Sequence, residues 1–94
     1  MQLPKTLKIG AHKFKIKLER GGALGTDCAG KCDYTKNTIT IDADLEDSQI
    51  VATLWHEIFH ALNNELSEKD VDFLAQGVTQ VVLDNQLSFR KLKK

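Results

Sequence analysis

The apolar residues of this chain change their period once, near residue 42. Before that point they alternate with polar residues, as Phe14, Ile16 and Leu18 do, and a period of two is typical of a strand with one buried face. After it they recur every three or four residues, which is the spacing of an amphipathic helix. The chain is therefore predicted to form a small α+β fold, and its 94 residues have room for only one core and one domain.

The predicted elements are two β-hairpins followed by two helices. Gly10 and Ala11 interrupt the first alternating stretch, and the second hairpin turns near residues 35–37, so the strands form a three- or four-stranded, mainly antiparallel sheet. Ile39 and Ile41 would face its core. The expected order is a hairpin over residues 1–20, a flexible loop over 21–30, a hairpin over 31–42, helices over 46–66 and 68–86, and a tail over 87–94.

The charges of the chain limit the kinds of partner that are expected. The formal net charge is zero, which removes the simplest argument for nucleic acid or an anionic membrane as a partner. Bases are nevertheless concentrated at residues 1–20 and 90–94. No run of 18 apolar residues and no secretory layout at the start of the chain is present, so the expected location is the cytoplasm. We therefore expect a protein or peptide partner, and neither nucleic acid nor a membrane.

Two histidines lie four residues apart in the first predicted helix, in the motif His56-Glu57-Ile58-Phe59-His60. Residues at this spacing share one helix face about 5–6 Å apart, so both imidazoles can reach one ion. Zinc accepts this geometry, and Glu57 is placed to act as the general base. A wide apolar arc indicates that the helix packs on two sides, so that its polar strip lines a groove. The alternative is a pair of solvent-facing histidines without function.

A catalytic zinc site also needs a third protein ligand and an open position. The acids considered for this role are Glu65, Glu68, Asp70 and Asp72. Glu68 and Asp70 fall in the first turn of the second helix, where capping and the helix dipole already account for acids. Asp72 lies at the border of the apolar stripe, so its carboxylate would point along the interface between the helices. We predict Asp72 as the third ligand, with Glu68 as the next candidate.

The residues around this motif resemble a known family. The stretch TLWHEIFHALNNEL, followed by DVDFLAQGVTQVVLDN, is similar to small zincin metallopeptidases of the gluzincin type, especially short phage and bacterial proteins related to the ImmA/IrrE group. In that family a strand pair runs into an HExxH helix, and an acid in an E-x-x-A setting on the next helix completes the site. The resemblance implies that His56, His60 and Asp72 bind Zn2+ and that Glu57 is the base. Asp72 stands where the family usually has Glu.

By this resemblance the chain would be a zinc-dependent metallopeptidase. Zinc would lower the pKa of its bound water towards 7 and polarise the scissile carbonyl, while Glu57 transfers the water proton to the leaving amine. The substrate would lie extended along an edge strand near residues 38–41. Tyr34 and His12 are the side chains considered for stabilising the oxyanion, although a packing role for Tyr34 and a turn role for His12 fit equally well.

Two other functions fit the same residues. Cys28 and Cys32 could join His56 and His60 in a closed Cys2His2 structural zinc site, although the 23 intervening residues exceed the zinc-finger spacing of about 12 and Glu57 would have no role. Otherwise the cysteines are incidental thiols of a glycine-rich loop. The second alternative is an inactive or regulatory zincin-like domain that binds a protein, because so short a chain offers little room for a specificity pocket.

Overall fold

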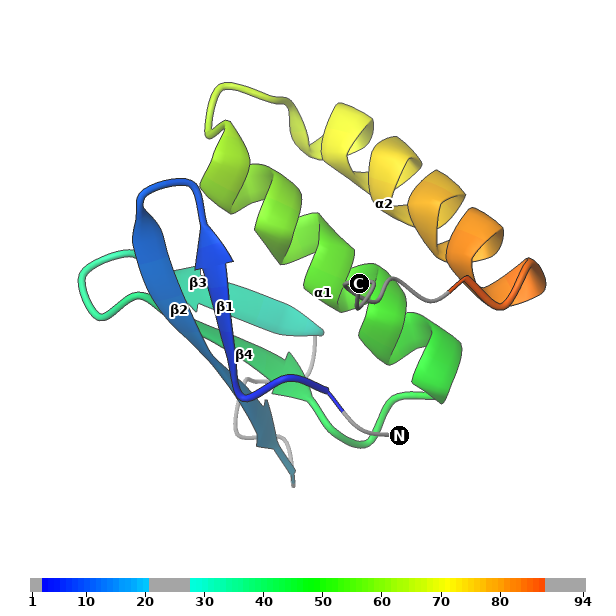
Figure 1. The fold of residues 1–94 in the computed structure, drawn as a ribbon, viewed down its shortest axis with the longest axis horizontal. Helices are drawn as coiled ribbons and strands as arrows, with labels where there is room; N and C mark the ends of the chain where they lie inside the picture. Colours follow the sequence, from blue (N-terminus) through cyan, green and yellow to red (C-terminus); the bar gives the residue numbers. More distant parts are fainter. Residues whose placement is uncertain (1–2, 21–27, 88–94) are drawn as a thin grey trace, which may run out of the picture.

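A computed structural model of the chain describes residues 3–20 and 28–87, which form a four-stranded sheet and two helices (Figure 1). The strands are β1 (Thr6–Ile9), β2 (His12–Glu19), β3 (Gly30–Asp33) and β4 (Thr38–Asp42). The helices are α1 (Asp47–Leu62) and α2 (Glu68–Asp84). The predicted α+β class is confirmed. Most of the predicted loop and tail, residues 21–27 and 88–94, lies outside the described residues.

The sheet is mixed, with the strand order β1-β2-β4-β3. β1 pairs antiparallel with β2, and β3 antiparallel with β4, whereas the two central strands β2 and β4 run parallel. The expectation of a mainly antiparallel sheet did not include this central pair. Either strand of a second hairpin can pair with the first hairpin, and side chains alternate between the faces in both arrangements. The alternation in the sequence therefore does not choose between them.

Helix α1 lies on one face of the sheet, and α2 lies on the far side of α1 (Figure 1). Six residues build the core between the sheet and α1: Ile9, Phe14, Ile39, Ile41, Ile50 and Leu54. Val71 and Ala75 of α2 are also buried, and among the described elements α2 contacts only α1. The alternation also places Leu18 on the core side, but Leu18 is 45% exposed near the end of β2. Within the described residues, neither helix is long and apolar enough to cross a membrane.

Polar side chains fix where both helices begin and where α1 ends. Glu46 and Gln49 form a capping box at the start of α1. At the start of α2 the Ser67 hydroxyl accepts a hydrogen bond from the Asp70 amide. α1 ends at Leu62 and not at residue 66. The Asn63 side chain accepts a hydrogen bond from the Glu65 amide, and such local bonds replace the backbone hydrogen bonds that would continue the helix. The resulting turn folds α2 back along α1.

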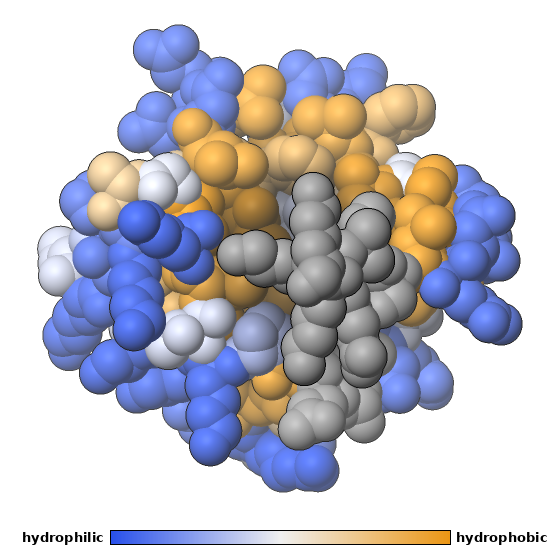
Figure 2. All heavy atoms as spheres, viewed as in Figure 1, coloured by the Kyte–Doolittle hydropathy of each residue, from blue (hydrophilic) through white to orange (hydrophobic). Residues whose placement is uncertain are grey.

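The outer side of the helical layer keeps apolar side chains in contact with solvent. Phe73 is 80% exposed, and Leu74 and Val81 are also exposed. Figure 2 shows such apolar side chains between hydrophilic ones on the face that it draws. Among the described elements α2 packs only against α1, so none of them forms a second layer over these side chains.

Gly30 lies where β3 passes close to α1. A Cβ atom at this position would come within 2.6 Å of Thr53 Cγ2 and 3.1 Å of the Thr40 carbonyl oxygen. We expect Gly30→Ala to lower the free energy of unfolding by about 1–3 kcal/mol through overpacking, as measured by urea denaturation. The loss should shrink in a Thr53→Ser background, which removes Cγ2 but keeps the hydroxyl that donates to the Gln49 carbonyl.

Gly77 is the matched control for this substitution. It lies inside α2, and a Cβ atom there would have no heavy atom within 4 Å. Gly77→Ala is therefore expected to raise the free energy of unfolding by about 0.5–1 kcal/mol through helix propensity. Equal stability of Gly30→Ala and the wild type would show that β3 and α1 do not pack as closely as described.

Candidate metal centre

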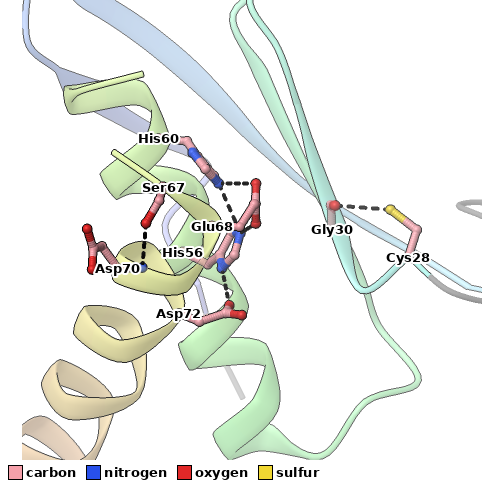
Figure 3. A network of polar contacts seen from close by, with 8 residues as sticks. All are labelled: Cys28, Gly30, His56, His60, Ser67, Glu68, Asp70 and Asp72. Carbon is pink, nitrogen blue, oxygen red and sulfur yellow. Dashed lines mark hydrogen bonds and ion pairs between the residues drawn. The ribbon is translucent and has the colours of Figure 1, made fainter. Parts of the chain in front are cut away.

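The two histidines of the motif project from successive turns of α1 towards the start of α2 (Figure 3). Their side chains are mostly shielded, with exposed fractions of 22% for His56 and 17% for His60. The expectation that the polar strip of α1 does not face open water agrees with this burial. The shielding comes from α2, whose first turn lies against the same strip of α1 (Figure 3).

The Nε2 atoms of His56 and His60 lie 3.1 Å apart. The carboxylate of Glu68 spans the pair, with Oε1 2.8 Å from His60 Nε2 and Oε2 3.2 Å from His56 Nε2 (Figure 3). One ligand atom from each of the three residues lies within 4.8 Å of the others. Two imidazole lone pairs at this separation repel unless a proton or a cation lies between them. The group of His56, His60 and Glu68 could therefore hold a metal ion.

The Asp72 carboxylate contacts the other ring nitrogen of His56. Its Oδ1 lies 2.7 Å from His56 Nδ1, whereas the Nε2 atom of the same ring faces Glu68. A carboxylate on Nδ1 fixes the tautomer that keeps the Nδ1 proton and leaves the Nε2 lone pair for a metal. Asp72 is therefore placed to orient His56. Glu68, and not Asp72, lies where the third metal ligand was expected from the sequence.

A signal for Glu68 was present in the sequence. From the sequence, an acid at Glu68 is explained by capping and the helix dipole. In the structure Ser67 is the N-cap, and its hydroxyl accepts a hydrogen bond from the Asp70 amide. The Glu68 carboxylate is therefore free to face the histidines. The E-x-x-A setting of the resembled family also fits Glu68-Lys69-Asp70-Val71 with the usual Glu, if Val71 replaces the small apolar residue.

Glu57 is buried between α1 and the sheet. Only 6% of its surface is exposed, and its Cγ lies 3.8 Å from where a Cβ atom on Gly30 would be. Burial raises the pKa of the Glu57 carboxyl, the electrostatic influence of His56 and His60 lowers it, and that of Glu68 raises it, with burial the largest of these effects. A carboxyl with a raised pKa is suited to accept and return a proton near neutral pH.

A cleft of about 560 Å³ opens beside His56. It is bounded by α1, α2 and the start of β3, and its lining includes Gly30, Thr53, His56, Asp72 and Thr79. The Thr79 hydroxyl is buried and has no hydrogen-bond partner among the described residues.

The predicted substrate strand is wrong. Residues 38–41 belong to β4, and β4 has β2 on one side and β3 on the other, so its backbone hydrogen-bonding groups face neighbouring strands. β1 and β3 are the two edge strands, and β3 is the one whose first residue, Gly30, lines the cleft. The topology therefore moves the exposed strand edge from β4 to β3.

Tyr34 and His12, the two side chains considered for the oxyanion, lie in different parts of the fold. Tyr34 follows β3 and shares a hydrogen bond with Cys32. Burial, the Cys32 thiol and the charge of Glu57 together raise the pKa of Tyr34 to about 12, so its phenol remains a donor at neutral pH. His12 begins β2 and pairs in register with Ile9 at the β1–β2 turn.

The cysteines do not belong to the metal-binding group of the described residues. The Cys28 thiol donates a hydrogen bond to the Gly30 carbonyl at 3.1 Å (Figure 3). Cys32 lies on β3 and packs against the core, and burial raises the pKa of its thiol. Both residues are free cysteines. This arrangement gives no support to the Cys2His2 alternative.

Substitution of the two acids separates a ligand from a residue that orients one. We expect Glu68→Gln to lower metal affinity more than Asp72→Asn, for which a loss of about 10–100-fold is typical of an outer-shell partner. Competition with a chromophoric chelator for Zn2+ or Co2+ measures both. Asp70→Asn, in the same turn of α2, is the control and should bind like the wild type. A larger loss for Asp72→Asn than for Glu68→Gln would return the ligand role to Asp72.

Replacement of both cysteines tests the structural zinc site. The Cys28→Ser/Cys32→Ser protein is expected to keep the metal stoichiometry of the wild type, because neither thiol is part of the metal-binding group. Elemental analysis after dialysis against dilute Zn2+ measures the stoichiometry. Loss of the ion in this variant, with the ion retained in Glu68→Gln, would favour the Cys2His2 alternative.

Comparison with known proteins brought no match for this chain. No protein-family model, no curated protein and no solved structure matches it. The functional conclusion therefore depends on the arrangement of the side chains described above.

Proposed function

We propose that this chain is a zinc-dependent metallopeptidase. The observation that carries the proposal is the convergence of His56, His60 and Glu68 within 4.8 Å of one another, beside the buried carboxyl of Glu57. Two histidines and one glutamate are the protein ligands of a class of catalytic zinc sites in which a fourth position stays open. The resemblance of the HExxH stretch to gluzincins supports the same assignment.

The spacing of the ligand atoms supports zinc as the ion. Tetrahedral bonds of about 2.0–2.1 Å separate two ligand atoms by about 3.3 Å. The two Nε2 atoms lie 3.1 Å apart, Glu68 Oε1 lies 2.8 Å from His60 Nε2, and Glu68 Oε2 lies 3.2 Å from His56 Nε2. Small side-chain rotations are therefore enough to admit the ion.

Zinc in such a site supplies a Lewis acid and lowers the pKa of water, and the residues of the chain supply the rest. Glu57 takes the proton of the attacking water and delivers it to the leaving amine. Asp72 holds the Nδ1 proton of His56, so that this ring keeps one orientation. Tyr34, which stays protonated at neutral pH, is the donor considered for the developing oxyanion.

A peptide in extended conformation is the substrate that the surroundings of the site favour. β3 is an edge strand beside the cleft, and a peptide that pairs with such an edge gains main-chain hydrogen bonds without regard to its sequence. Such an edge recognises a backbone, which supports hydrolysis of an amide bond.

The decisive experiment is the Glu57→Gln substitution. The zinc-loaded wild type is expected to cleave members of an unbiased peptide library, and Glu57→Gln to reduce the rate by about 10²–10⁴-fold, because it removes general base catalysis. Zinc content should not change, since Glu57 is outside the ligand group. Mass spectrometry of the library and elemental analysis measure the two effects.

Glu65→Gln is the matched control, because Glu65 is an exposed acid in the turn between the helices and should leave cleavage unchanged. Equal cleavage by Glu57→Gln and the wild type would exclude Glu57 as the base. One bound zinc per chain with no cleavage of any library member would overturn the peptidase and favour the regulatory binding domain.

A further inference from the structure

The face of the sheet that points away from α1 is lined with lysines. Five of them share this face, and we call them the lysine face: Lys8, Lys13, Lys15, Lys17 and Lys31. All five are exposed. Both helices lie on the opposite side of the sheet (Figure 1), so no described element covers the lysines.

The strand register brings these lysines together from three strands. Lys8 on β1 lies directly opposite Lys13 on β2. Lys17 on β2 and Lys31 on β3 lie on either side of Thr40 in the central strand β4. Thr40 is only 8% exposed although it points away from the core, because the aliphatic stems of long side chains can cover a neighbour while their charges stay in water. The charges therefore form one surface.

The acids on this side of the sheet do not neutralise the lysines. Glu19 and Asp42 lie beside each other at the ends of β2 and β4. The Asp33 carboxylate accepts hydrogen bonds from the amides of Thr35 and Lys36 and from the Thr35 hydroxyl. None of the five lysines forms an ion pair with a described residue. Their charges are available to a partner.

Protection of a sheet edge explains only part of the lysine face. Lysines often guard exposed edge strands against aggregation, but Lys15 pairs with Thr6 of β1 on one side and with Thr38 of β4 on the other. Like charges placed directly opposite each other, as Lys8 and Lys13 are, destabilise a sheet. The chain therefore tolerates a cost in stability on this face.

Among the described residues, the acids are separated from this face. Residues 43–87, which contain both helices, carry nine acids and one base, Lys69. Residues 3–20 carry six bases and one acid. Within this part of the chain, the helical layer therefore repels a polyanion and the opposite side of the sheet attracts it, which favours one orientation of approach.

We infer that the lysine face binds the phosphate backbone of a nucleic-acid duplex. Lysines supply the charge that neutralises phosphates, and the hydroxyl of Thr6, which shares this face, belongs to the groups that commonly contact phosphate oxygens. The four strands contain no arginine and no amide side chain that could read bases from this face. Binding is therefore independent of sequence.

Two other polyanions fit this face less well. Proteins that bind single strands stack the bases on aromatic side chains, and the described strands place no aromatic residue on the lysine face. Stable attachment to an anionic membrane needs a lipid or apolar anchor besides basic residues, and the same residues include no apolar side chain on this face. A duplex requires neither feature.

Fluorescence anisotropy with a labelled duplex of mixed sequence tests this inference on the full chain. If all five lysines contact phosphates, the slope of log K against log salt should be about −4.5, so that affinity falls about 500-fold between 50 and 200 mM NaCl. Lys15→Gln, at the centre of the face, should weaken binding and reduce this slope by about 1. Lys69→Gln, the same change on α2, should leave both unchanged. Circular dichroism checks that both variants keep the fold.

Several outcomes would overturn the inference: no binding to the duplex at 50 mM NaCl, equal weakening by Lys15→Gln and Lys69→Gln, or tighter binding to a single strand of the same length. Binding to phosphatidylserine vesicles without binding to the duplex would assign the face to a membrane. The peptidase is tested separately, by the cleavage rate of Glu57→Gln. A failure of duplex binding can therefore be distinguished from a failure of the proposed peptidase.

Discussion

The contact between the start of α2 and the polar strip of α1 is the constraint on which the candidate site depends. The histidines alone form a pair at helical spacing, and such a pair can lie on any solvated helix surface. The turn after Leu62 and the N-cap at Ser67 bring a carboxylate across both imidazoles at distances of 2.8 and 3.2 Å. A third ligand atom then faces two preformed nitrogen ligands, and Asp72 fixes the orientation of one ring.

The same packing explains why α1 can hold reactive groups in a chain of this size. α1 lies between the sheet and α2 (Figure 1). Apolar residues stabilise it on these two sides, and its polar strip lies between the two apolar contacts. Glu57 is the residue most affected, because it lies on the sheet side of the strip and is nearly buried. Gly30 permits this close approach, since a side chain on β3 at that point would meet α1.

The fold also separates the two kinds of charge. The sheet collects lysines on its outer face, and the helical layer collects acids around the candidate metal centre. A formal net charge of zero describes neither surface, which is why the expectation of no nucleic-acid partner, based on that total, and the inference from the lysine face point in different directions. The total is a sum over the chain, whereas a partner meets one face.

The sequence by itself determined the α+β class, the positions of most elements and the pair of histidines beside a glutamate, because each of these follows from the spacing of residues close together in the chain. It did not determine that β2 and β4 pair in parallel, that β3 is at an edge of the sheet while β4 is central, or that Glu68 faces the histidines while Asp72 contacts the Nδ1 side of His56. These features depend on which segments meet across the fold. Alternation and helical periodicity are the same for either strand pairing, and two acids one helical turn apart differ in role only once the angle between α1 and α2 is fixed by packing.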